Sequence, residues 1–354
     1  VNVLRHNPKM RLFFLVLLSI VCAPLWALEQ VTLQLNWKHQ FQFAGYYAAI
    51  EKGYFREAGY EVTLVEAGAS HDPIAAVLKG DARFGVGASE LALHRARGEP
   101  VVALATILQH SPLVLIAGTQ VANNVHALSG RRIMLMPHET ELYAYLKREG
   151  ITRYRAEQHS FDPADLISGK VDALSGYSTD EPFVLDKAAF KYAIFTPRSA
   201  GIDFYGDTLF TTENAINANR KGVRAFRAAV IKGWEYAMVH PEEIADLILA
   251  RYSKRHSKDH LLFEAAEMQR LMQPELVEIG HMTEGRWQQI AQHYAELGMV
   301  SPNTKISGLI YEDKPQKLPV WVLPLMVIGV LVIIFVGFFA IYFGRLNRRL
   351  EREI

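Results

Sequence analysis

The loop after an early alternating segment gathers side chains suited to holding a small planar molecule. Residues 31–37 read VTLQLNW and alternate like a strand. Aromatic faces stack on flat rings, and imidazole and hydroxyl groups add hydrogen bonds. The small pair Ala44-Gly45 then opens a predicted helix whose free backbone donors would face the same guest. The candidate ligand-binding residues of this stretch are Trp37, His39, Phe43 and Tyr46.

Polar groups at three later places extend this candidate site. Ser89 follows a glycine-rich strand end, where it either caps a helix or also contacts the ligand. Glu181 opens another predicted helix, where an acid suits the helix dipole or accepts hydrogen bonds from ligand amino groups. Asp203 and Tyr205 lie in a segment rich in glycine and aromatic residues. That segment either forms a hinge turn or binds a heteroaromatic by charge and stacking.

The common catalytic templates are missing from the sequence. It contains no H-E-x-x-H, C-x-x-C, G-x-S-x-G or Walker sequence. The loop histidines His39, His71 and His138 share no ligand spacing on one element, so we predict no metal site. We also predict no cofactor and no catalytic residues.

The elements that would position these residues alternate between short strands and helices. This order predicts an α/β fold with mostly parallel sheets. The predicted strands cover residues 31–36, 61–66, 83–86, 101–107, 113–117, 131–136, 171–175, 192–196 and 207–212. The predicted helices cover residues 44–57, 72–79, 89–97, 140–149, 163–168, 181–189, 215–219 and 221–239, and the pattern from 241 to about 298 is all helical.

Two polar segments, 118–129 and 197–206, look like crossings between two lobes. They predict a first lobe of residues 29–117 and 208–310 and a second lobe of residues 118–207. Ligands bind between such lobes because helix N-termini and loops converge there.

Hydrophobic runs at both ends predict export and anchoring. Residues 1–27 combine basic residues, an apolar run and a small residue at Ala27, as a signal peptide does. Residues 320–343 lack charge and are long enough to span a bilayer once. Four arginines follow this run, which predicts a cytoplasmic tail at 344–354. The protein would then be held in the inner membrane by one span, with its main domain, 28–318, outside the cytoplasm. Between these ends 31 basic residues face 35 acidic ones, which makes nucleic acid an unfavourable partner.

Several short motifs of this chain resemble one family. They are Leu35-Asn36-Trp37, Ala44-Gly45, Gly53-Tyr54-Phe55, Gly80-Asp81, Phe84-Gly85-Val86-Gly87-Ala88-Ser89-Glu90 and Arg97-Gly98. The family unites bacterial periplasmic pyrimidine-binding proteins with fungal thiamine pyrimidine synthases. The resemblance implies the two-lobed type II periplasmic-binding-protein fold. It also implies either delivery of pyrimidine precursors to ABC transporters or synthesis of the pyrimidine from pyridoxal phosphate and a histidine of the protein itself.

Two departures from the synthases argue against catalysis. The sixth residue after the motif tryptophan is their sacrificial histidine, and here that residue is Phe43. The segment Ile202–Asp207 contains no cysteine, whereas the synthases carry a cysteine-rich run there. We therefore predict a binding domain rather than an enzyme.

The layout is most similar to sensor domains that precede a membrane helix. The sequence thus predicts a tethered domain for a small pyrimidine-like metabolite, as the input of a signalling protein. Signal transfer through one span favours a homodimer. The alternatives are an anchored substrate-binding component of an ABC importer, with a permease as partner, and a pyrimidine synthase.

Overall fold

The computed structural model describes residues 28–68, 72–136, 139–302, 304–313 and 322–350. The chain forms two compact units, Val1–Tyr311 and Glu312–Ile354. The predicted signal peptide over residues 1–27 lies outside the described residues, and so do residues 314–321, where the predicted domain ends and the predicted span begins.

A five-stranded sheet with the order β2-β1-β3-β10-β4 forms the first lobe. Strand β1 pairs in parallel with β2 and β3, while the central strand β3 is followed by β10, which is inserted in the antiparallel direction between β3 and β4. The sheet is therefore parallel except for one reversed strand. β4, VVALAT, is buried throughout, as a continuous apolar run in a covered sheet should be. The strands are β1 (Glu29–Gln34), β2 (Tyr60–Val65), β3 (Phe84–Gly87), β4 (Val101–Thr106) and β10 (Thr208–Thr212).

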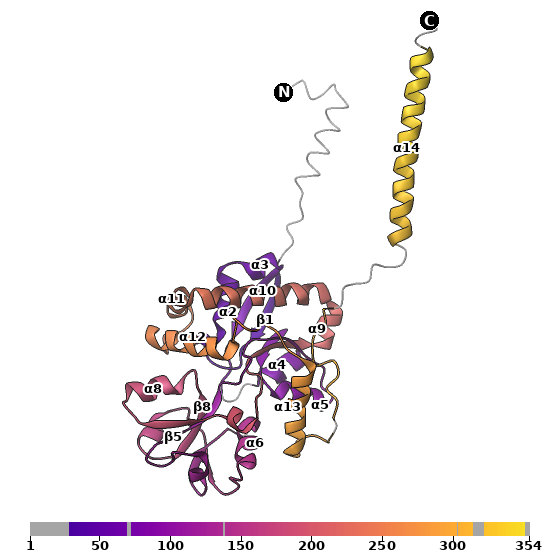
Figure 1. Ribbon diagram of the computed structural model, residues 1–354. Helices are drawn as coiled ribbons and strands as arrows, with labels where there is room; N and C mark the ends of the chain where they lie inside the picture. Colours follow the sequence, from indigo (N-terminus) through magenta and orange to yellow (C-terminus); the bar gives the residue numbers. More distant parts are fainter. Residues whose placement is uncertain (1–27, 69–71, 137–138, 303, 314–321, 351–354) are drawn as a thin grey trace. The chain divides into compact units, whose positions relative to one another are not determined.

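Helices from both ends of the unit cover this sheet (Figure 1). The N-terminal half contributes η2 (Phe41–Phe43), α2 (Ala44–Glu51), α3 (Tyr54–Glu57), α4 (Pro73–Lys79) and α5 (Glu90–Ala96). The half after β10 contributes α9 (Glu213–Ala218), α10 (Arg220–Val239), α11 (Pro241–Arg251), α12 (Lys258–Met272) and α13 (Glu284–Glu296).

Ala44 and Gly45, the small residues at the start of α2, allow this helix to pack closely against α10. A Cβ atom at Gly45 would overlap the Trp234 ring of α10, and one at Gly233 would overlap the backbone oxygen of Gly45. Ala44 and Gly45 are buried in this crossing. The N–H of Ala44, one of the predicted free donors, is used by the preceding turn, since it donates to the Phe41 oxygen.

The second lobe holds another five-stranded sheet, of order β7-β6-β8-β5-β9. It also carries one reversed strand, β5, which pairs antiparallel with β8 and β9. The predicted lobe boundary at residue 117 is therefore wrong, because β5 belongs to the second sheet. The strands are β5 (Leu113–Gly118), β6 (Arg132–Met134), β7 (Arg155–Glu157), β8 (Ala173–Tyr177) and β9 (Tyr192–Phe195).

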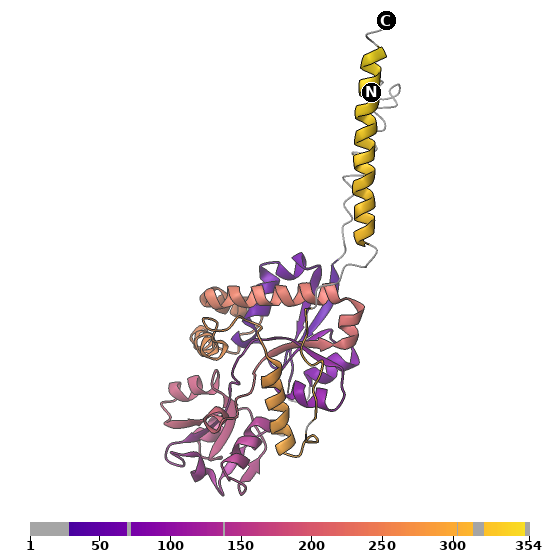
Figure 2. The same cartoon turned by 45° about the vertical axis from the view of Figure 1, so that its right-hand side comes forward.

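Short helices accompany the second sheet. They are η3 (Val125–Leu128), α6 (Thr140–Arg148), α7 (Ala164–Ile167), α8 (Glu181–Lys187) and η4 (Pro197–Ala200). A small cluster of buried side chains that includes Ile116 and Leu174 packs one face. Figure 2 shows the elements of this lobe gathered at one end of the unit and those of the first lobe at the other.

The two lobes are joined by the crossing segments, residues 107–112 and 196–207. They run side by side, because the backbone N–H of Ile107 donates to the Asp207 oxygen at 2.7 Å and that of Ser111 donates to the Phe204 oxygen at 2.9 Å. One buried apolar cluster includes Leu115 of the second lobe, Phe204 of a crossing segment and Phe210 of the first lobe. The core is thus continuous through the crossings.

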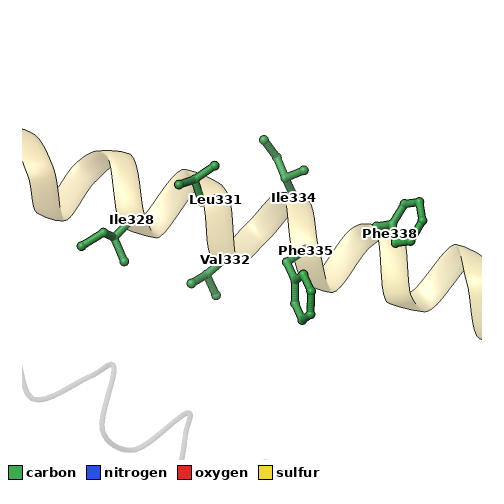
Figure 3. Close-up of a pocket in the computed structure, with 6 residues that line it drawn as sticks. All are labelled: Ile328, Leu331, Val332, Ile334, Phe335 and Phe338. Carbon is green, nitrogen blue, oxygen red and sulfur yellow. The ribbon is translucent and has the colours of Figure 1, made fainter.

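The second unit contains α14 (Val322–Leu350), a helix of 29 residues. Six of its apolar side chains line a shallow hollow and project to several sides of the helix (Figure 3): Ile328, Leu331, Val332, Ile334, Phe335 and Phe338. Over the residues that the structure describes, no helix is long and apolar enough to span a membrane. The predicted span at residues 320–343 is therefore not supported.

Candidate ligand-binding site at the junction of the lobes

Asp207 ends a crossing segment just before β10 and is only 2% exposed. Its oxygens accept hydrogen bonds from Asn36 Nδ2 at 3.0 Å and from Gln42 Nε2 at 2.7 Å. Burial raises the pKa of this carboxyl group to about 6, although the two amide donors oppose the shift. Because the two amide donors are neutral, they do not compensate the negative charge of the ionised carboxylate.

The hydroxyl group of Tyr46 lies in the field of the same carboxylate. Burial raises the Tyr46 pKa first, and the charge of Asp207 raises it further. The hydroxyl group is buried and makes no hydrogen bond of good geometry among the described residues, although the Trp234 side chain lies near enough to oppose the shift. Such a group is costly to bury, so it is a natural partner for a bound molecule.

The second lobe contributes two acids from helix starts. Glu139 precedes α6, and its Oε2 accepts a hydrogen bond from the Met136 N–H at 2.8 Å. Glu181 begins α8, and its Oε2 accepts one from the Tyr177 N–H at 2.6 Å. Burial raises the pKa of Glu139 to about 7. Burial, followed by the neighbouring charge of Asp180, raises the pKa of Glu181 to about 8.

Tyr177, the last residue of β8, shows that these acids from both lobes converge. Burial raises its pKa most, and charges on both lobes add to the shift. The four acids that act on this one hydroxyl group are Asp207, Glu90, Glu139 and Glu181, here called the junction carboxyls. Asp207 and Glu90 belong to the first lobe, and Glu139 and Glu181 belong to the second.

The junction carboxyls determine which groups of a ligand can bind here. The raised pKa values of Asp207, Glu139 and Glu181 lie near neutral pH, so these three groups can accept a hydrogen bond as carboxylates or donate one as acids. Their joint negative potential favours amino groups and protonated ring nitrogens, and it disfavours anions such as sulfonates and phosphates. The arrangement is suited to a small molecule rich in amino groups.

Trp37 reaches from the end of β1 to the second lobe. Its ring centroid lies 5.1 Å from that of Phe161, with a tilt of 38°. A planar guest between two rings needs about 7 Å, twice an ordinary contact distance. The two rings therefore touch each other here, and a guest that stacks on Trp37 would have to displace Phe161.

Two of the other predicted site residues are used inside the first lobe. His39 Nδ1 lies 2.9 Å from the Tyr47 hydroxyl oxygen, and its ring also contacts that of Tyr252. Burial lowers the pKa of His39. Phe43 is fully buried in the first-lobe core and has no free face for stacking.

Three more predicted residues bond to α13 and the segment before it. Ser89 does not cap α5, because its Oγ lies 2.8 Å from the Tyr294 hydroxyl oxygen. Asp203 pairs with Arg286 at 3.0 Å and with His110 at 2.7 Å. Tyr205 is buried, and its hydroxyl oxygen accepts the Thr283 N–H at 3.1 Å. Of the eight predicted residues, Glu181, Tyr46 and Trp37 lie at the junction.

Sequence reasoning missed Glu90, Glu139 and Asp207. Each stands next to the start of a helix or strand, where an acid has the ordinary structural explanation of capping or of interaction with the helix dipole. The available signal was their recurrence, since both lobes place acids after a strand end. Only the fold shows that these ends face one another.

Three named proteins are similar to this chain in sequence. A formylaminopyrimidine-binding protein of Halalkalibacterium halodurans is 27% identical over 235 residues, which cover 63% of this chain and 71% of that protein. A riboflavin-binding protein, RibY, of Chloroflexus aurantiacus is 26% identical over 63% of this chain and 66% of its own length. The 4-amino-5-hydroxymethyl-2-methylpyrimidine phosphate synthase THI13 of Saccharomyces cerevisiae is 23% identical over 60% of this chain and 68% of its own length.

The fold defines the class of the protein. The periplasmic aliphatic sulphonate binding protein SsuA of Escherichia coli superposes with a TM-score of 0.59 at 14% identity, covering 82% of this chain and 96% of that one. The chain therefore has the two-lobed periplasmic-binding-protein fold, as the sequence predicted. Residues 40–244 match the description NMT1/THI5 like, and the chain belongs to this family.

Proposed function

We propose that this chain is a solute-binding domain that holds a small amino-bearing heteroaromatic, of the pyrimidine type, at the junction of its lobes. The observation that carries the proposal is that Asp207 and Glu139, buried acids beside the crossing and in the second lobe, form no ion pair among the described residues, and both act on the hydroxyl group of Tyr177. A ligand with amino groups would receive hydrogen bonds from both lobes at once and so favour their association. The names of two relatives, which specify binding of a formylaminopyrimidine and of riboflavin, agree with a heteroaromatic ligand.

The same acids argue for binding rather than synthesis. The synthase relative is named for a phosphorylated pyrimidine, and a phosphate group would meet the negative potential of the junction carboxyls. Phe43 replaces the sacrificial histidine of the synthases and is buried in the core. We therefore propose no catalytic step for this chain.

A ligand panel tests the binding proposal. Thermal shift and calorimetry with the purified full chain should show saturable binding of an unphosphorylated aminopyrimidine. The matched analogue with a methyl group in place of the amino group should bind more weakly, because a methyl group cannot donate to a carboxylate. Tight binding of alkylsulfonates or of the phosphorylated pyrimidine, with none of the aminopyrimidine, would contradict the proposal.

Trp37 has a separate role in this proposal. If its ring stacks on the ligand after Phe161 moves, Trp37→Ala should weaken binding by roughly 1–3 kcal/mol. Calorimetry with Trp321→Ala as the control, a tryptophan of the second unit, checks this. An unchanged affinity in Trp37→Ala would remove Trp37 from the site.

The biological setting remains a prediction from the sequence. We propose an extracytoplasmic domain anchored through residues 320–343, acting as the input of a signalling protein. An anchored component of an ABC importer is the second candidate. Membrane fractionation of cells expressing the full chain tests the anchor, since release by a high-salt wash without detergent would contradict it. Genes for a permease and an ATPase beside this one would favour the importer, and a signalling module that follows would favour the sensor.

A further inference from the structure

Four side chains outside the junction carboxyls form a cluster, here called the His/carboxylate cluster. It consists of Asp180, His256, His260 and Glu264. Each offers one nitrogen or oxygen atom, and these atoms all lie within 4.8 Å of one another. Ligand atoms around a tetrahedral zinc ion lie about 3.3 Å apart, given bonds of about 2.0–2.1 Å. A contraction of about 1.5 Å or less would therefore bring the four atoms to such an ion.

The local fold explains why three of these side chains meet. His260 and Glu264 lie four residues apart on α12, so they stand on one face of the helix, one turn apart. His256 precedes the helix start by two residues, and its ring centroid lies 3.9 Å from that of His260. The sequence contains this spacing of four and eight residues, but our prediction of no metal considered other histidines.

The fourth group comes from the other lobe. Asp180 stands in the turn between β8 and α8, and its Oδ1 lies 2.9 Å from His260 Nε2 and 3.9 Å from His256 Nε2. Phe183 of α8 stacks on the His260 ring with a centroid distance of 4.3 Å. The cluster therefore joins the second lobe to α12 of the first.

Several polar atoms of the cluster are buried without a hydrogen bond. His260 is 4% exposed and Glu264 is 1% exposed. Nε2 of His260 and Oε1 of Glu264 have no hydrogen-bond partner of acceptable geometry among the described residues, and neither does Nε2 of His256. His260 Nε2 already lies close to Asp180 Oδ1, whereas the buried Glu264 Oε1 has no partner, and an unpaired buried oxygen is costly. These are the atoms that would bind an ion.

The surroundings leave the cluster suited to a cation. The second oxygen of Glu264 is fixed by the Phe41 N–H at 2.7 Å, which orients the carboxyl group. Arg255 lies nearby, but its guanidinium group donates to Gln40. Metal ligands bind as ionised carboxylates and neutral imidazoles, and in that form the four groups would carry a charge of −2, against the single positive charge of Arg255.

We propose that Asp180, His256, His260 and Glu264 form a binding site for a transition-metal ion of the zinc type that links the two lobes. Two imidazoles with two carboxylates suit Zn²⁺, whereas Mg²⁺ and Ca²⁺ prefer oxygen ligands alone. The ion holds the turn before α8 against α12. It is separate from the organic ligand, so this proposal stands whether or not an aminopyrimidine binds.

Metal titration of the full chain tests the site directly. The protein is stripped with a chelator and titrated with Zn²⁺ by calorimetry, and with Co²⁺ by visible absorption, which reports tetrahedral geometry. We expect one ion for each chain, and a rise in the melting temperature with Zn²⁺ because the ion binds only the folded state. Mg²⁺ should produce neither effect. Absence of saturable one-to-one binding of Zn²⁺ and Co²⁺ would overturn the proposal.

Substitutions assign the ion to these residues. Loss of a neighbour that merely orients a ligand costs 10–100-fold in metal affinity, so loss of a direct ligand in His260→Gln should cost at least about tenfold. His293→Gln is the matched control, because that histidine also contacts a carboxylate, Glu296, at 3.2 Å but lies outside the cluster. Equal affinity in wild type and His260→Gln would mean adventitious binding elsewhere and would overturn the proposal.

Asp180→Asn tests the link between the lobes and serves if His260→Gln fails to fold. It removes the only cluster ligand from the second lobe while keeping the side-chain shape. We expect weaker Zn²⁺ binding and a smaller rise of the melting temperature. A Zn²⁺ affinity and melting shift equal to wild type would show that Asp180 is no ligand and would overturn the interlobe site.

Discussion

Asp203 and Asp207 stand four residues apart in one crossing segment, yet the fold treats their charges differently. Asp203 lies between His110 and Arg286, at 2.7 and 3.0 Å. Among the described residues, the side-chain partners of the Asp207 carboxylate are the amides of Asn36 and Gln42. The first carboxylate is compensated by a cation, and the second is not.

This difference distinguishes a carboxylate that stabilises the structure from carboxyl groups that are available to a ligand. Asp203, His110 and Arg286 connect the two crossing segments to α13, so their charges hold the frame between the lobes. Among the junction carboxyls, Asp207 and Glu139 are buried and Glu90 and Glu181 are half-buried, and none of the four forms an ion pair with a described residue. Burial without a partner charge is unfavourable for folding alone, which indicates that these acids are kept for a ligand.

The largest expected effect is on the pH dependence of stability. The pKa of Glu181 is about 8 in the folded protein, above its ordinary value of 4.5. Between these two pH values the folded state keeps a proton that the unfolded state has lost, so the free energy of unfolding falls as pH rises. Glu181→Gln should remove this loss and stabilise the protein at pH 8 by roughly 2–4 kcal/mol, with little change at pH 4.5.

Denaturant unfolding across this pH range checks the prediction. Glu296→Gln is the control, because that carboxyl group lies on the surface of α13, and its pH profile should follow wild type. A Glu181→Gln profile parallel to wild type would show that Glu181 is not held in its protonated form.

Asp207→Asn should give the next largest effect, on ligand affinity. It removes a charged acceptor, which is worth about 1.5–3 kcal/mol. The aminopyrimidine should therefore bind roughly ten- to a hundredfold more weakly in calorimetry. Undiminished affinity would take Asp207 out of the site.

Asp203→Asn is the matching experiment on the ion-paired carboxylate of the same crossing segment. Loss of the partly exposed pair with Arg286 should lower the free energy of unfolding by about 1 kcal/mol. Affinity for the aminopyrimidine should stay unchanged in calorimetry. A large loss of affinity with unchanged stability would reverse the comparison and restore Asp203 as a ligand contact.

The smallest expected effect concerns Phe161, where the second lobe meets Trp37. Phe161 has φ of 61°, a left-handed conformation that is unfavourable for residues other than glycine. Phe161→Ala should lose the ring contact, about 0.5–1.5 kcal/mol. Phe161→Gly loses the same contact but relieves the backbone strain, so denaturant unfolding should find it more stable than Phe161→Ala. The reverse order would show that this conformation costs nothing.

Much of the fold was predictable because it depends on local pattern. Runs such as VVALAT at β4 are buried on both faces and are recognisable as strands. β7, Arg155–Glu157, was missed because its three residues are all exposed and two of them are charged. The first crossing was misplaced because residues 107 and 108 are buried and apolar, so they look like a continuing strand rather than a connection.

The site was harder to predict because its contacts join distant parts of the chain. Ser89 bonds to Tyr294, which lies 205 residues away. Glu264 accepts a hydrogen bond from Phe41, across 223 residues. Aromatic residues were predicted as ligand contacts from the sequence, yet Phe43 and Tyr205 are buried in the core. Acids at helix starts have an ordinary local explanation, and only the meeting of two lobes gives them a shared role.

The central claim is that acids of both lobes receive the amino group of the ligand. Its most direct test compares an aminopyrimidine with its methyl analogue in two proteins, wild type and the double variant Asp207→Asn, Glu181→Gln. Calorimetry should give wild type a preference for the amino compound of at least about tenfold, which corresponds to about 1.4 kcal/mol. That preference should fall to near unity in the double variant. A preference of the same size in both proteins would show that the amino group binds elsewhere.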